Sequence, residues 1–95
     1  MNALIIIALF LGVAMADIHH NCGCTAHGSY NVELSQAACA SWASNQPNTD
    51  WDGYSCVDKG RGRGIDGAPW ETTCKNAWDI NFGGNKNDAW GKCWH

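Results

Sequence analysis

Six cysteines limit what this sequence can fold into more than any other feature. They all follow residue 16, at positions Cys22, Cys24, Cys39, Cys56, Cys74 and Cys93. An even number of cysteines in a short chain predicts a disulfide framework when the compartment is oxidising. Each disulfide is expected to contribute ~2–4 kcal/mol, largely by restricting the unfolded chain. A bridge between Cys22 and Cys24 would close a very small, strained ring. We therefore expect three disulfides in which these two cysteines bond elsewhere, and the sequence leaves the pairing open.

The first sixteen residues have the layout of a secretory signal peptide. An apolar run over residues 3–13 precedes a small-x-small triplet at residues 14–16. This pattern predicts cleavage before Asp17. A membrane anchor needs ~18–20 apolar residues, and this run is shorter. We expect a protein that is secreted and extracellular, with a signal peptide over 1–16, a His-rich N-terminal arm over 17–28 and a single disulfide-rich domain over 29–95.

The charge balance argues against two classes of partner. The formal net charge is −3, and no block of like charge runs along the chain. Nucleic-acid binding by bulk positive potential and membrane lysis by a basic amphipathic helix both need the opposite pattern. We expect a monomer with no nucleic-acid partner and no stable membrane insertion. The partner expected is an extracellular host or competitor molecule, with a glycan among the candidates.

The spacing of apolar residues predicts a small α+β domain. Alternation over 29–34 predicts a strand, and Ser35 is a suitable N-cap for a helix that ends near Asn45. A second helix is expected over 69–78, where Pro69 suits a first helical position. Further strands are expected over 54–58, 80–82 and 89–94. The sequence therefore predicts two helices packed on an antiparallel sheet, each fixed to it by a disulfide.

The N-terminus that cleavage would create begins with Asp17, Ile18 and His19. A free α-amine with histidine in third position is an amino-terminal motif for Cu(II) and Ni(II). The amine, two deprotonated backbone amides and the imidazole form a square-planar set of four nitrogens, which suits both ions. We expect no required cofactor, but we predict Cu(II) binding at these three residues.

Aromatic and basic residues supply the candidate binding groups. The chain has six tryptophans, and we expect Trp42, Trp70 and Trp78 to fill the core, because large aromatics compensate for few aliphatics. Trp51, in a polar loop, is the best exposed candidate for stacking on sugar rings, together with its neighbour Tyr54. Arg61 and Arg63 lie in a glycine-rich segment and are candidates for contact with an anionic group. The binding residues predicted from sequence are thus Trp51, Tyr54, Arg61 and Arg63.

The sequence contains no local signature of catalysis. It has no nucleophile elbow and no acid–base motif. Glu33, Glu71, the two arginines and the four histidines could assemble a ribonuclease-like site, but their spacing does not single one out. We therefore expect that the protein is not an enzyme, and a small ribonuclease-like hydrolase remains an alternative.

One further expectation comes from a resemblance. It rests on Cys22-Gly-Cys24, Ser35-Gln-Ala-Ala-Cys39, Cys56, Gly64-Ile-Asp-Gly67, Cys74 and Cys93. In this pattern the chain resembles small cysteine-rich secreted proteins of filamentous fungi, which include effector candidates and killer-toxin-like proteins. The resemblance implies a non-enzymatic interaction protein with an α/β sandwich, and it carries no functional residue with it. A carbohydrate-binding module that uses an exposed tryptophan is the competing interpretation.

Overall fold

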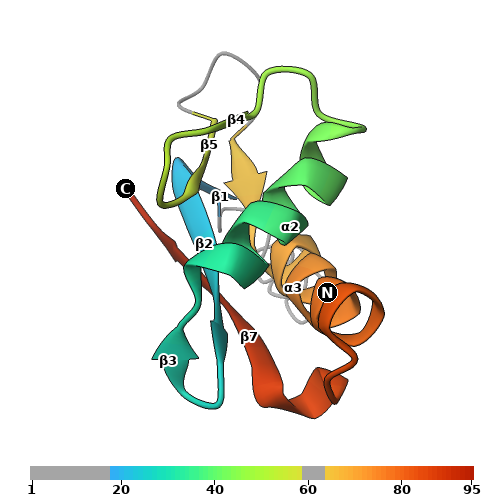
Figure 1. Ribbon diagram of the computed structural model, residues 1–95. Helices are drawn as coiled ribbons and strands as arrows, with labels where there is room; N and C mark the ends of the chain where they lie inside the picture. Colours follow the sequence, from blue (N-terminus) through green and yellow to red (C-terminus); the bar gives the residue numbers. More distant parts are fainter. Residues whose placement is uncertain (1–17, 59–63) are drawn as a thin grey trace, which may run out of the picture.

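The computed structural model of the chain describes residues 18–58 and 64–95. Within these ranges the chain forms two helices and antiparallel strands, so the predicted α+β class is confirmed (Figure 1). In chain order the elements are β1 (Ile18–His19), β2 (Asn21–Ala26), β3 (Ser29–Tyr30), α2 (Val32–Ala43), β4 (Asp50–Trp51), β5 (Cys56–Val57), β6 (Ile65–Asp66), α3 (Gly67–Phe82), the short 3-10 helix η1 (Lys86–Asp88) and β7 (Ala89–Trp94). Neither described helix is long and apolar enough to cross a membrane.

Strand β2 is the centre of the main sheet. It pairs with β7 along its whole length, from Asn21 opposite Trp94 to Ala26 opposite Ala89. On its other side it pairs with β3 and β5, and β4 adds to β5. Strands β1 and β6 form a separate two-stranded sheet. The expected arm over 17–28 is therefore wrong for residues 21–26, whose alternate side chains are buried within the sheet.

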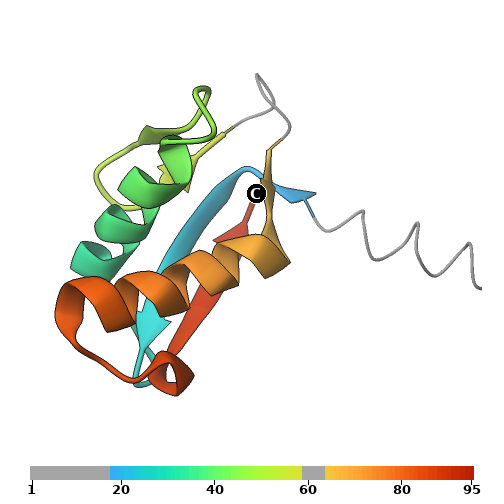
Figure 2. The ribbon, with the colours of Figure 1, turned by 90° about the vertical axis from the view of Figure 1, so that its right-hand side faces the viewer.

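Three disulfides join the elements. Cys22–Cys93 links β2 to β7, Cys24–Cys74 links β2 to α3, and Cys39–Cys56 links α2 to β5. All six cysteines are paired, as predicted. Helix α2 contacts β2, and α3 contacts both β2 and β7 (Figure 2). The side chains of β2 that are buried toward the helices are Cys22, Cys24 and Ala26.

Helix α2 begins earlier than predicted. Its N-cap is Asn31, whose Oδ1 accepts a hydrogen bond of 2.8 Å from the backbone N–H of Leu34. The predicted cap, Ser35, is instead a buried residue of the first turn. Its hydroxyl accepts from the backbone N–H of Cys24 at 2.7 Å and donates to the carbonyl of Asn31 at 2.7 Å. Asparagine caps helices as well as serine does. Because the helix starts directly after Asn31, the strand expected over 29–34 is limited to β3.

Helix α3 is longer than predicted at its C-terminal end. It continues to Phe82 and ends where Gly83 adopts a left-handed conformation, with φ of 68°. The strand expected over 80–82 is therefore wrong. Ile80 is 79% exposed and Phe82 is 42% exposed, so their alternation does not reflect burial of a strand face. Glycine is the residue that most readily adopts the left-handed conformation that ends a helix.

Trp70 is the largest fully buried side chain, and it connects α3 to the sheet. Its indole N–H donates to the carbonyl of Gly23 in β2 at 2.7 Å. The ring of Trp42 from α2 meets it edge-on, with 5.7 Å between centroids. Trp42 and Trp78 are partly buried against the same core. The three tryptophans predicted for the core therefore all lie there.

Candidate functional site

One face of the main sheet carries the side chains that the core does not use. Successive side chains of a strand point to opposite faces of the sheet. Because Cys22 and Cys24 point toward the helices, the residues that alternate with them point away. In β7, Cys93 lies opposite Cys22 and therefore points toward the helices as well, so the residues that alternate with Cys93 also point away from the helices. We call this surface the outer face, and β2 and β7 place on it Asn21, Gly23, Thr25, Trp90, Lys92 and Trp94.

An aromatic cluster covers part of the outer face. The ring of Tyr30 stacks on that of Tyr54, with 4.5 Å between centroids. Trp94 lies 6.2 Å from Tyr30 and 6.3 Å from Tyr54 by the same measure. The hydroxyl of Tyr30 donates to the backbone carbonyl of Tyr54 at 2.6 Å. Position 23 has to be glycine for this packing, because a Cβ there would overlap the Tyr30 phenol.

The surroundings of Tyr30 keep its phenol protonated. Burial raises its pKa above the ordinary value of about 10, and nearby Tyr54 and Asp52 raise it further. A hydrogen bond with Ser35 lowers the pKa and partly opposes these effects. The Tyr30 hydroxyl therefore serves as a stable donor to the loop that carries Tyr54.

A short polar network fixes that loop. The carboxylate of Asp52 accepts from the backbone N–H groups of Tyr54 at 2.8 Å and Ser55 at 2.6 Å. Its second oxygen accepts from the Ser55 hydroxyl at 3.0 Å. The Ser55 hydroxyl in turn accepts from the side-chain amide of Asn21 at 3.1 Å. Side-chain hydrogen bonds of this kind are what hold an Asx turn in one conformation. Tyr54 is thus held in place although its side chain is 51% exposed.

The cluster and the network enclose an open hollow of about 370 Å³. We call it the aromatic hollow, and it is lined by Asn21, Asp52, Tyr54, Ser55, Lys92 and Trp94. Its walls are two aromatic rings, and the rest of its lining consists of hydrogen-bonding groups. Aromatic faces stack on the apolar side of a ligand ring, while amide, hydroxyl, carboxylate and ammonium groups bond to its polar edge. A sugar ring offers both kinds of surface.

The structure separates the four binding residues predicted from sequence. Tyr54 lines the aromatic hollow. Trp51 does not line the hollow. It lies opposite Cys56, which in turn lies opposite Cys22, so its side chain is on the face of the sheet that the helices cover, and it is half-buried against the core. The expectation that Trp51 is the exposed tryptophan is therefore wrong. Arg61 and Arg63 lie outside the described residues.

The residues that the sequence reasoning missed come mainly from β7. Trp94 and Lys92 line the hollow, and Trp90 is 53% exposed on the same face. Residues 89–94 read Ala-Trp-Gly-Lys-Cys-Trp, so small or core residues alternate with large or polar ones. Alternation of this kind is the sequence signal that would have placed all three on one face.

The predicted copper site is described only in part. Asp17 lies outside the described residues, whereas Ile18 and His19 pair with Asp66 and Ile65 of β6. In an antiparallel pair of strands, only every second residue hydrogen-bonds its backbone N–H to the partner strand. One of the two backbone amides of Ile18 and His19, both of which a four-nitrogen site needs, is therefore already bonded to β6. Copper binding would therefore require β1 to leave β6. Among residues 18–58 and 64–95, no group of three or more His, Cys, Asp or Glu side chains is arranged to hold a metal.

Cu(II) binding at the N-terminus stays a prediction with a direct test. We expect the protein cleaved before Asp17 to bind one Cu(II) and to show the visible absorption band of a square-planar four-nitrogen site. The His19→Ala variant and the same protein with its α-amine acetylated should both lack the band. His27→Ala is the matched control, because His27 is exposed and lies in the turn between β2 and β3. A band that survives His19→Ala would contradict the prediction.

Comparisons with models of known protein families, with curated proteins and with solved structures found no match for this chain.

Proposed function

We propose that this chain is a secreted, non-enzymatic binding protein that recognises a glycan through the aromatic hollow. In this proposal it acts outside its producing cell, in the manner of an effector or toxin-like protein, on a glycan of a host or competitor. The observation that carries the proposal is the aromatic hollow itself. There, Tyr54 and Trp94 stand beside a preformed set of hydrogen-bonding groups. Small-ligand sites commonly combine apolar walls with a few well-placed polar groups.

The disulfide framework supports the extracellular part of the proposal. Three disulfides in a chain of 95 residues are typical of extracellular proteins, because reducing conditions inside cells oppose disulfide formation. The disulfides also favour a preformed site. Cys22–Cys93 joins β2 to β7 next to Asn21 and Trp94, two residues of the hollow. A ligand that binds a rigid site does not have to order it first.

A binding role is favoured over the alternative of a ribonuclease-like hydrolase. The carboxylate of the hollow, that of Asp52, holds the loop of Tyr54 through three hydrogen bonds. The two glutamates considered for catalysis lie outside the hollow. Glu33 is in the first turn of α2, and Glu71 in α3 accepts from the backbone N–H of Gly91 at 3.3 Å. We expect the protein to leave RNA intact across the pH range in a digestion assay.

The proposal is tested by retention on insoluble glycans. We expect the secreted protein to be retained on at least one of chitin, cellulose and β-glucan. Tyr54→Ala and Trp94→Ala should each weaken retention about twofold to twelvefold, which corresponds to the ~0.5–1.5 kcal/mol typical of one aromatic contact. Both variants remove an aromatic wall of the hollow.

The matched control is Phe82→Ala, which removes an exposed aromatic side chain from α3. It should leave retention unchanged. The Trp51→Ala variant separates this proposal from the interpretation based on sequence alone. If the hollow binds the glycan, a Trp51 variant that remains folded keeps its retention. Failure of all three glycans to retain the protein, or retention that Tyr54→Ala and Trp94→Ala leave unchanged, would contradict the proposal.

A further inference from the structure

Trp90 lies on the outer face but does not line the aromatic hollow. Its side chain is 53% exposed, more than that of any other tryptophan among the described residues. Exposure of a large aromatic side chain leaves apolar surface in water, which is unfavourable in the absence of a ligand. A single exposed aromatic is common and needs no explanation. Two further observations distinguish Trp90.

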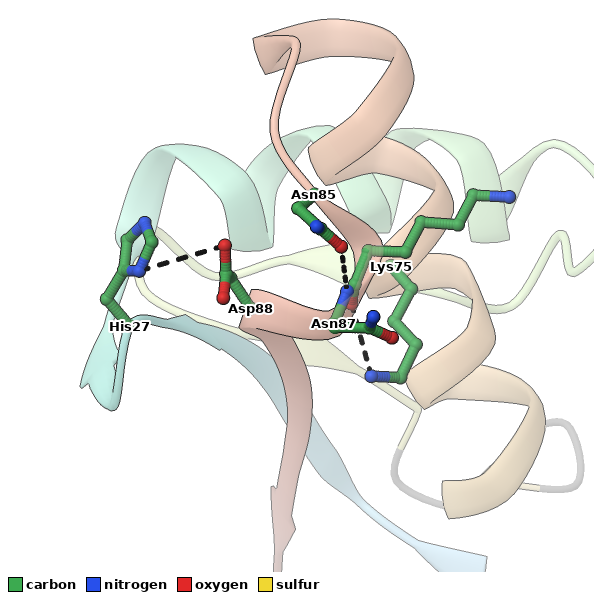
Figure 3. Close-up of polar contacts among 6 residues, drawn as sticks. His27, Lys75, Asn85, Asn87 and Asp88 are labelled. Carbon is green, nitrogen blue, oxygen red and sulfur yellow. Dashed lines mark hydrogen bonds and ion pairs between the residues drawn. The ribbon is translucent and has the colours of Figure 1, made fainter.

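The first observation is that Lys75 of α3, which starts on the helix side of the sheet, reaches the Trp90 ring at the edge of β7 that does not pair with β2. Its ammonium group lies 4.2 Å from the centre of the indole ring. The same group donates to the carbonyl of Ala89 at 2.7 Å and to that of Lys86 at 3.2 Å, so it is fixed from three sides. Figure 3 shows Lys75 extending from α3 to the segment that carries Asn87, where it meets the Lys86 carbonyl. A cation over an indole face is a favourable contact. One face of Trp90 is therefore supported by the protein, and the exposed part of the ring is presented to solvent.

The second observation is that Trp90 lies on the same strand and the same face as Trp94, which lines the hollow. Trp90, Lys92 and Trp94 alternate with Ala89, Gly91 and Cys93, so all three lie on the outer face. A strand advances about 3.3 Å per residue, which places the two tryptophans about 13 Å apart along β7. Lys92 lies midway between them. The outer face thus has two aromatic contact points with a hydrogen-bond donor between them.

We infer that the ligand is a linear oligosaccharide that lies along β7, with one sugar ring against Trp94 in the aromatic hollow and another against Trp90. Lys92 donates a hydrogen bond to a hydroxyl group of the segment between them. This inference rests on the proposed function and names its ligand class as an extended chain of several sugars. A single terminal sugar would occupy the hollow alone and would leave Trp90 without a role.

The inference is tested by the dependence of affinity on ligand length. The probes are soluble oligosaccharides, from the disaccharide to the hexasaccharide, of the polysaccharide that retains the protein. We expect affinity to rise with length until the ligand spans both tryptophans, and then to remain constant. Trp90→Ala should weaken binding of the longest oligosaccharide about tenfold and leave binding of the disaccharide unchanged. Tyr54→Ala should weaken the binding of both.

Two further variants show whether the orientation of Trp90 matters. Lys75→Met keeps the length of the side chain but removes the charge over the indole, and it should weaken binding of the long oligosaccharide only. Trp90→Phe keeps an aromatic ring and should restore part of the affinity lost in Trp90→Ala. Thermal unfolding of each variant establishes that the comparison is made between folded proteins.

The outcomes separate the two proposals. If none of the glycans binds, the proposed function fails. If the disaccharide binds as tightly as the hexasaccharide, or if Trp90→Ala leaves binding of the hexasaccharide unchanged, the proposed function stands and this inference is overturned. A loss of affinity for both ligand lengths in Trp90→Ala would also overturn it, because Trp90 would then belong to a site for a short ligand.

Discussion

Removal of the disulfide between Cys24 and Cys74 is expected to lower the free energy of unfolding by about 4 kcal/mol. The two residues are separated by 50 positions in the sequence, and both side chains are fully buried where β2 meets α3. A crosslink that closes a loop of this length removes much of the freedom of the unfolded chain. Typical domains unfold with only ~5–15 kcal/mol in total, so the loss is a large part of the stability.

The measurement is chemical denaturation of the variant Cys24→Ala/Cys74→Ala, in which alanine avoids placing a polar group in the core. Cys39→Ala/Cys56→Ala is the matched control, because that disulfide closes a loop of only 17 positions. The same relation gives about 3 kcal/mol for it. We expect both variants to be destabilised, and the Cys24/Cys74 variant to be the less stable. An unfolding free energy that does not change when Cys24 and Cys74 are replaced would contradict the expectation.

The fold class could be predicted from sequence because it depends on local patterns and on cysteine count. Pro69 and the spacing of Trp70, Cys74 and Trp78, which are separated by one helical turn each, predict the second helix. The same pattern does not predict where the helix ends, because Ile80 and Phe82 alternate as strand residues do, although both are exposed on the helix. Periodicity over three residues cannot distinguish a strand from the last turn of a helix.

The candidate site could not be predicted in the same way, because it is assembled by strand pairing. Asn21, Tyr54 and Trp94 come from three distant segments, and they meet because β7 and β5 lie on opposite sides of β2. A shift of β7 by one residue would move Trp94 to the face of the core. The register that prevents this shift places Cys93 opposite Cys22, and the sequence leaves that pairing open. The Cys22–Cys93 disulfide therefore fixes which residues of β7 face the site, but the pairing of these two cysteines cannot be predicted from the sequence.

Gly23→Ala is expected to weaken glycan binding about as much as Tyr54→Ala does and to destabilise the protein by ~1–3 kcal/mol, the usual cost of forcing extra volume into a packed site. The Tyr30 phenol lies directly over the Cα of Gly23, and an added methyl group would overlap it. Tyr30 cannot turn aside without losing both its stacking on Tyr54 and its hydrogen bond to the Tyr54 carbonyl. Displacement of Tyr30 therefore removes the support of the exposed aromatic wall.

A double-mutant cycle with Tyr30→Ala tests whether the collision is the cause. If it is, Gly23→Ala costs much less stability in the Tyr30→Ala background, because the added methyl group then occupies the space that the phenol has left. Binding should not recover in the double variant, since Tyr54 still lacks its stacking partner. Thr25→Ala, two residues along the same face of β2, should leave binding unchanged. Equal costs of Gly23→Ala in the two backgrounds would show that Gly23 is required for another reason, and that the aromatic hollow does not depend on the contact between Tyr30 and β2.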